Sequence, residues 1–267
     1  MKRKGTELGN LSARFFAYTQ LKNKTVIRTG EIAPVLNITE AQEYDLLRRL
    51  TDSGWIVRLK RGVYLIPARL PAGGKYSPGT STILDRLMKE YEGEYQITGP
   101  NAFNFYGFDD QVPNRYYVYN NRISGKRTIG NQMFQFIKTS DQRLGYITEI
   151  ATPQGVNLIY SSKARTLVDV VYDWSRFNSL PRGYKWIESE IETELEFASE
   201  LVDATIKYGN QAAFRRIGYL LDLQGQLANI VAPLLNKLSK SKSLIPWIPN
   251  KASRGSLNRK WGLIVNG

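Results

Sequence analysis

The sequence contains no cysteine and no histidine. The absence of cysteine excludes a disulfide framework and thiolate metal sites, and the absence of histidine excludes the usual zinc sites and the histidine-dependent nucleophile pairs. No apolar run approaches about 20 residues, so we expect no transmembrane helix and no membrane partner. The basic start MKRKGTELGN lacks an apolar signal-peptide core, and we therefore expect a cytoplasmic protein.

Charge is unevenly distributed along the 267 residues, whose formal net charge is +13. Residues 1–75 carry 14 Lys+Arg against 6 Asp+Glu, and residues 236–267 carry 7 against none. Residues 76–235 carry 16 against 18. Two basic ends favour a nucleic-acid partner. An anionic membrane surface is the alternative, but neither end shows a long basic amphipathic helix with a clean apolar face.

Residues 25–67 have the element order of a winged helix-turn-helix. We expect Thr29 to cap a short helix that ends at Leu36, with Pro34 one turn in. A second helix is predicted from Thr39, because TEAQ at residues 39–42 fits a capping box, and Gly54 suits the position after its end. In this fold the second helix enters the DNA major groove.

The second predicted helix has two distinct faces at about 100° per residue. Leu46, Leu47 and Leu50 fall on one side and are predicted to pack in the core. The opposite side carries small, polar and charged residues, which is typical of a recognition helix. We expect Arg48 to read guanine, Tyr44 to contact a base or a phosphate, and Thr39 to hold a phosphate. The DNA-binding candidates on this helix are Thr39, Ala41, Gln42, Tyr44, Asp45, Arg48 and Arg49.

A basic hairpin follows this helix. The β-rich runs at residues 55–59 and 63–66 flank Lys60, Arg61 and Gly62, and Gly62 can adopt the positive φ that a short hairpin loop requires. Arg58, Lys60 and Arg61 would place charge at the tip, where a wing meets phosphates. Either the helix or the hairpin alone also fits an ordinary charged surface, but their combination in this order favours binding of double-stranded DNA.

The rest of the chain predicts a mixed architecture. Residues 76–175 alternate helical and strand-like runs separated by turn residues, whereas residues 185–238 are helical throughout. The predicted fold class is α+β: an N-terminal winged helix-turn-helix domain (residues 1–70), then a mixed α/β domain (residues 76–267). The second domain would comprise a small sheet unit (76–175), a helical C-terminal part (185–238) and a basic tail (239–267).

An acidic run precedes the last helices. Clustered carboxylates bind divalent ions only when their oxygens converge, and a solvated acidic helix face is the simpler interpretation. We therefore expect no metal site, no cofactor and no catalytic residues, and we predict that the protein is not an enzyme. The run consists of Glu188, Glu190, Glu192, Glu194, Glu196 and Glu200.

Three passages resemble the AbiEi antitoxins of bacterial type IV toxin–antitoxin (abortive infection) systems. They are LTDSGWI at 50–56 running into KRGVY at 60–64, IYSSKARTLVD at 159–169, and GNQAAFRRIGYLL at 209–221. The end, WGLIVN at 261–266, is also similar. The first passage is shared by many winged-helix regulators, whereas the third is more distinctive. The resemblance covers nearly the whole chain.

This resemblance implies a function. Such proteins repress their own operon by binding inverted repeats, and their C-terminal part counteracts a nucleotidyltransferase-like toxin without needing a stable complex. Copies would be monomeric in solution or pair on DNA. Arg215 and Arg216 are the exposed basic candidates for the antitoxin surface, and the residues expected to serve the operator are Thr39, Tyr44, Arg48, Arg58, Lys60 and Arg61.

Two other functions stay open at this point. The first is a metal-dependent nuclease that the winged helix targets to DNA, although residues 95–160 show no compact Asp…Glu-x-Lys cluster. The second is a ligand-sensing transcriptional regulator that has no toxin partner.

Overall fold

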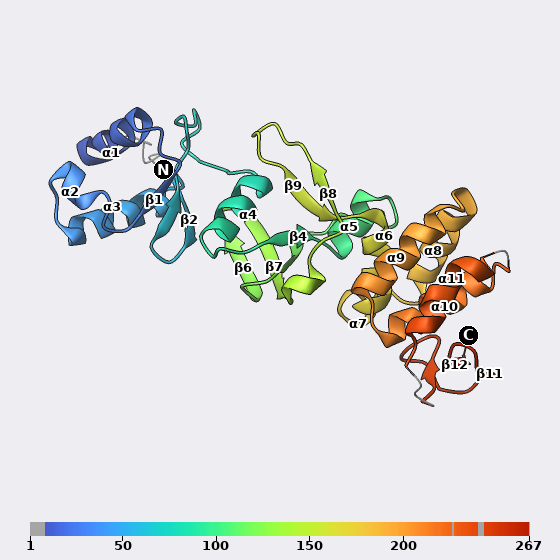
Figure 1. Ribbon diagram of the computed structural model, residues 1–267. Coiled ribbons are helices and arrows are strands. Elements are labelled where there is room, and N and C mark those ends of the chain that lie inside the picture. Colours follow the sequence, from blue (N-terminus) through green and yellow to red (C-terminus); the bar gives the residue numbers. More distant parts are fainter. Residues whose placement is uncertain (1–8, 226, 240–242, 267) are drawn as a thin grey trace, which may run out of the picture. The chain divides into compact units, whose positions relative to one another are not determined.

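The computed structural model (Figure 1) describes residues 9–225, 227–239 and 243–266. Its chain divides into two compact units. The first unit comprises Met1–Gly93, Gly125–Gln135 and Ala151–Asn157, and the second comprises Glu94–Ser124, Phe136–Ile150 and Leu158–Gly267. The predicted α+β class is confirmed. Compact units need not coincide with independently folding domains, so the limits 1–70 and 76–267 stay a prediction. Residues 1–8 and 240–242, which the predicted domain and tail include, lie outside the described residues.

The first unit begins with three helices and three short strands. Strand order is β1-β3-β2, and both pairings are antiparallel. Apolar side chains from all three helices and from the sheet form one core, which includes Phe15, Ile27, Leu36, Leu46, Leu50 and Tyr64. The elements are α1 (Asn10–Leu21), β1 (Val26–Arg28), α2 (Ala33–Leu36), α3 (Glu40–Asp52), β2 (Val57–Lys60) and β3 (Val63–Leu65).

The start of the winged region differs from the prediction. Thr29 does not cap α2, because that helix begins at Ala33, and Pro34 therefore lies in its first turn, where proline is tolerated. The backbone N–H of Thr29 instead donates to the carbonyl of Gly62 at 2.9 Å. Strand β1 precedes it and pairs with β3. A three-residue strand is too short to show a period, which explains why the sequence pattern did not reveal it.

The first unit also contains α4 (Thr80–Lys89), β6 (Gly125–Ile129) and the start of β7 (Gln132–Lys138). The Thr80 hydroxyl donates to the Gln132 side chain at 2.7 Å, which ties α4 to β7. A Cβ placed on Gly130, between β6 and β7, would lie 3.5 Å from the Val57 side chain of β2. The winged elements and this second hairpin are therefore packed together within one unit.

The second unit holds a sheet with the strand order β5-β4-β9-β8, in which β4 pairs antiparallel with β5 and parallel with β9. Strand β7 continues from the first unit into the second. The Thr139 N–H, just after β7, donates to the carbonyl of Asn120 at the end of β5. The elements are β4 (Tyr95–Ile97), α5 (Pro100–Phe105), β5 (Tyr116–Asn120), a 3-10 turn (Asp141–Arg143), β8 (Ile147–Ile150) and β9 (Leu158–Ser161).

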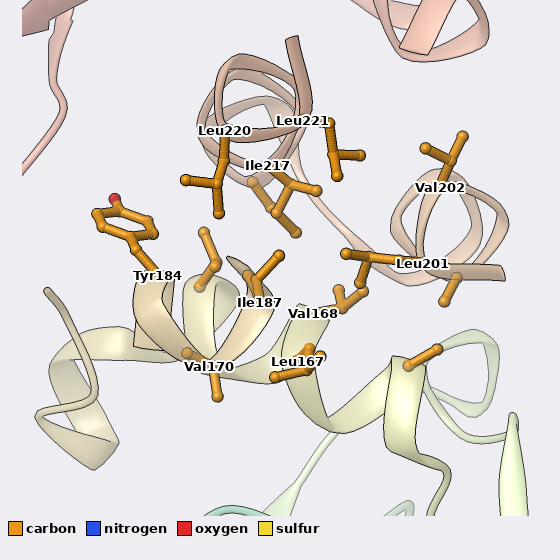
Figure 2. Close-up of a cluster of buried hydrophobic side chains, with 14 of the residues drawn as sticks. Leu167, Val168, Val170, Tyr184, Ile187, Leu201, Val202, Ile217, Leu220 and Leu221 are labelled. Atoms are coloured by element: carbon orange, nitrogen blue, oxygen red, sulfur yellow. The ribbon is translucent and has the colours of Figure 1, made fainter. Parts of the chain in front are cut away.

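Helices and a small terminal sheet complete the second unit. The helices are α6 (Lys163–Tyr172), α7 (Trp174–Phe177), α8 (Arg182–Thr193), α9 (Phe197–Tyr208), α10 (Gln211–Asp222) and α11 (Ala228–Lys237). Figure 2 shows how α6, α8, α9 and α10 converge on one apolar core. The terminal strands are β10 (Ile245–Pro246), β11 (Ser256–Asn258) and β12 (Leu263–Val265). Among the described helices, none combines the length and apolar character that crossing a membrane requires.

Candidate nucleic-acid interface

The start and end of α3 are fixed by the predicted residues. The Gln42 N–H donates to Thr39 Oγ1 at 3.2 Å, and the Thr39 N–H donates to Gln42 Oε1 at 2.9 Å, which completes the capping box. Ser53 caps the other end, and Gly54 follows with φ +80°. Both predicted limits are confirmed. Because the box occupies the Gln42 side-chain oxygen, Gln42 has a structural role at the helix start.

The inner face of α3 carries one polar residue that sequence reasoning missed. Leu46, Leu47 and Leu50 are buried as predicted, but Glu43 is also 0% exposed. Its two carboxylate oxygens accept hydrogen bonds of 2.8 Å from the N–H groups of Gly30 and Ile32. A carboxylate on the inner face, three residues before Leu46, was the available signal. Glu43 therefore fixes the turn before α2 against the candidate recognition helix.

We expect Glu43→Gln to lower the free energy of local opening of this turn by about 1 kcal/mol. The amide offers only one acceptor oxygen and directs an NH₂ group at the second backbone donor. Amide hydrogen exchange of Gly30 and Ile32 should accelerate about fivefold. Glu40→Gln, an exposed substitution on the same helix with the same change in charge, is the matched control. Equal exchange rates in both variants would contradict the role given to Glu43.

The outer face of α3 carries the predicted DNA-binding side chains. Ala41, Tyr44, Asp45, Arg48 and Arg49 are all exposed, as is Thr39 at the helix start. Arg48 Nη2 lies 3.1 Å from Asp45 Oδ1, and both side chains are more than half exposed. Exposed pairs of this kind contribute about 0–1 kcal/mol, so Arg48 can exchange Asp45 for a guanine at little cost.

The predicted hairpin is present as β2 and β3, but Lys60 belongs to strand β2 and not to the turn. Lys60 pairs with Val63, which leaves Arg61 and Gly62 in the turn, and Gly62 has φ +74°. The register shifts between Arg58 and Lys60, so the wing strand contains a bulge. Arg58 and Arg61 are exposed, and neither guanidinium has an ion-pair partner within the part of the chain that the structure describes. Among the described residues, the wing therefore carries two exposed positive charges that no acidic side chain pairs with.

Lys60 has a different environment from the two wing arginines. Its Nζ donates to the Glu90 carbonyl at 2.7 Å, lies 3.6 Å from the Glu90 carboxylate, and sits 4.5 Å from the centre of the Tyr91 ring. Arg28 of β1 also binds the Glu90 carboxylate. Glu90 follows α4, 30 residues beyond Lys60 in the sequence, so only the fold shows this contact. Lys60 is therefore already neutralised in the free protein.

Residues 20–67 match the family described as "Transcriptional regulator, AbiEi antitoxin". The matched segment contains α2, α3 and the wing, so the resemblance to AbiEi antitoxins is confirmed over the candidate DNA-binding elements. No curated protein matches the chain.

The fold of most of the chain is similar to that of a solved structure. The crystal structure of the RV2827C protein from Mycobacterium tuberculosis is similar, with a TM-score of 0.58 and 14% identity over 96% of this chain and 92% of that chain. At this level of identity the similarity shows the fold alone. It extends well beyond the segment that matches the AbiEi family.

Within the AbiEi-like segment, Arg61→Ala and Lys60→Ala should differ in their effects on DNA binding. Loss of one phosphate contact at Arg61 should weaken binding to all sequences alike and reduce the slope of log affinity against log salt by about one. Lys60→Ala should change that slope by less, because Glu90 already neutralises Lys60. Fluorescence anisotropy on two unrelated duplexes at several salt concentrations measures both slopes. An unchanged affinity of Arg61→Ala at low salt would contradict the wing assignment.

Arg215 and Arg216 do not form an exposed surface. Each is 5% exposed, so the expectation that they are accessible is wrong. Arg215 Nη1 donates to the Ser243 carbonyl at 2.7 Å, and Arg216 Nη2 donates to the Pro246 carbonyl at 3.0 Å. Burial lowers the pKa of the Arg216 guanidinium. Both arginines bind the segment at residues 243–266, called the terminal segment below, to α10. The helical pattern of α10 alone could not indicate this contact.

The acidic run spans the end of α8, the connection and α9. Glu190 lies 2.8 Å from Lys163 Nζ, and desolvation together with Glu192 raises the pKa of Glu188. Within the described ranges, no group of three or more acidic side chains is arranged to hold a metal ion. The acidic run does not lie on one continuous helix, because α8 ends at Thr193 and α9 begins at Phe197.

Proposed function

We propose that this protein is the antitoxin and DNA-binding autorepressor of a type IV toxin–antitoxin operon. The observation that carries the proposal is the exposed outer face of α3, together with a wing whose two exposed arginines have no ion-pair partner among the described residues. Both lie within the segment that matches the AbiEi family. A capped helix with a solvated basic face and an adjacent basic hairpin is the arrangement that winged-helix proteins use on DNA.

In this proposal, α3 enters the major groove of an operator half-site. Arg48 reads a guanine through a bidentate contact, Tyr44 contacts a base or a phosphate, and the exposed Thr39 hydroxyl donates to a phosphate at the helix start. Arg58 and Arg61 neutralise phosphates beside the groove. Each half of an inverted repeat takes one copy of the chain, so copies are monomeric in solution or pair on the DNA.

The second unit carries the proposed antitoxin role. Its functional partner is a nucleotidyltransferase-like toxin, which the antitoxin counteracts in the cytoplasm without a stable complex. The surface that serves this role excludes Arg215 and Arg216, because both are buried beneath the terminal segment.

A reporter placed behind the protein's own upstream DNA tests repression. We expect reporter expression to fall when the intact chain is supplied, and to recover when Arg48 and Arg61 are both replaced by alanine. Growth of cells that express the neighbouring toxin tests the second role separately, and the same double variant should still restore growth. Repression by the double variant equal to that of the wild-type chain would contradict the proposed interface.

We also propose that the protein acts without cleaving DNA. Labelled duplex incubated with the protein and Mg²⁺ or Mn²⁺ should remain intact, whereas a metal-dependent nuclease would cut it. Protein-dependent cleavage that a chelator stops would favour the nuclease over the repressor.

A further inference from the structure

The second unit contains a cavity of about 960 Å³ that is unrelated to the DNA-binding candidates. It lies between the loop after α5, at residues 109–114, and the chain that leads from α7 into the first turn of α8. Its volume is at the upper end of the range of about 300–1,000 Å³ that small-molecule sites occupy. No residue of the proposed operator interface lines it.

The walls of the cavity are partly apolar. Tyr117 and Phe177 line one part, with ring centres 5.9 Å apart in an edge-to-face arrangement, and Leu180 lines another. Val112 stands in the loop at the edge and is 82% exposed, the highest exposure among the large apolar side chains of the described residues. Covering so exposed an apolar side chain with a ligand is favourable, because it removes apolar surface from water. A flat ring of a ligand can pack against the aromatic side chains of the wall.

Two cationic side chains give the cavity its charge. Arg182 and Lys185 both line it, and their three-residue spacing in α8 places them on one helix face. Arg182 Nη1 binds Asp109 Oδ2 at 2.7 Å, and the Arg182 guanidinium lies 5.2 Å from the centre of the Trp186 ring. These contacts hold the guanidinium in place while its other N–H groups stay available.

Among the described residues that line the cavity, Asp109 is the one carboxylate, and both of its oxygens already accept hydrogen bonds. Besides the Arg182 contact, Asp109 Oδ1 accepts the Gln111 N–H at 3.1 Å. Lys185 is exposed and has no ion-pair partner among the described residues. The charge left over in the cavity is therefore positive, which favours an anionic ligand.

We propose that this cavity binds a small organic anion with a flat ring, of the class of a nucleoside monophosphate. The phosphate would bind Arg182 and Lys185, and the ring would lie against Tyr117 and beneath Val112. Binding of this kind does not depend on the proposed DNA-binding function, because every group that it uses belongs to the second unit.

Isothermal titration of the full-length protein tests this proposal without DNA. The probes are AMP, GMP, CMP and UMP, with inorganic phosphate and adenosine as partial ligands. At least one monophosphate should bind in a 1:1 ratio and more tightly than either partial ligand. Lys185→Ala should weaken that binding about tenfold or more, because it removes a charge-assisted hydrogen bond.

Two further variants complete the experiment. Gln111→Trp places a large side chain at the cavity from an exposed position and should abolish binding. Arg176→Ala removes a positive charge from α7 outside the cavity and should leave binding unchanged. Absence of saturable heat with all four monophosphates would overturn the proposal, as would equal affinity in the Lys185→Ala and Arg176→Ala variants.

Discussion

Arg48→Ala is expected to weaken binding to the protein's own upstream DNA by about 1–3 kcal/mol and to relax the sequence preference at one position of each half-site. The effect is expected to be this large because a bidentate contact to guanine is lost, whereas the Asp45 pair that Arg48 gives up on binding is exposed and weak. Anisotropy titrations on the upstream duplex and on single-base variants of it measure both effects.

Arg176→Ala is the matched control for this experiment. Arg176 and Asp173 also form an i,i+3 ion pair, with 3.6 Å between Nε and Oδ2, and the Arg176 side chain is 46% exposed. Both substitutions remove one positive charge from an i,i+3 ion pair, although Asp173 is only 19% exposed, and only Arg48 lies on the proposed recognition helix. If both variants weaken binding to the same small extent, Arg48 contributes only net charge and α3 does not read sequence.

Trp261→Ala is expected to destabilise the second unit by about 3–5 kcal/mol. Trp261 is 0% exposed, its indole N–H donates to Asp222 at 3.0 Å, and its ring fills the space that the absent side chain of Gly218 leaves on α10. A Cβ on Gly218 would lie 2.1 Å from the Trp261 ring. Truncation of the indole therefore opens a cavity and removes the N–H donor from Asp222.

Urea unfolding followed by tryptophan fluorescence and far-UV circular dichroism measures this loss. Leu257→Ala, in the same terminal segment but at a side chain that is 55% exposed, should change the free energy of unfolding by no more than about 0.5 kcal/mol. A loss below about 1 kcal/mol for Trp261→Ala would mean that the terminal segment is not an integral part of the core.

Local sequence signals predicted much of the candidate site. The capping box of Thr39 and Gln42 needs four consecutive residues, and the turn at Gly62 needs one residue that tolerates positive φ. The buried leucines of α3 follow from a period within a single helix. Each of these features depends on neighbours in the chain, and each is present in the structure as predicted.

Features that depend on distant contacts were not predictable in this way. Lys60 is neutralised by Glu90, and the turn before α2 is held by Glu43 on the following helix. Arg215 and Arg216 are charged residues whose burial depends on carbonyl groups about 30 residues further on. A charged side chain is normally exposed, so only the packed terminal segment shows that these two are structural.

Binding of the purified protein to its own upstream DNA, compared with a scrambled duplex of equal length at two salt concentrations, tests the central claim most directly. We expect tight binding to the upstream duplex, weaker binding to the scrambled one, and a steep loss of both at higher salt. Equal affinity for the two duplexes at both salt concentrations would show that only charge attracts DNA, and would contradict the assignment of α3 as a recognition helix.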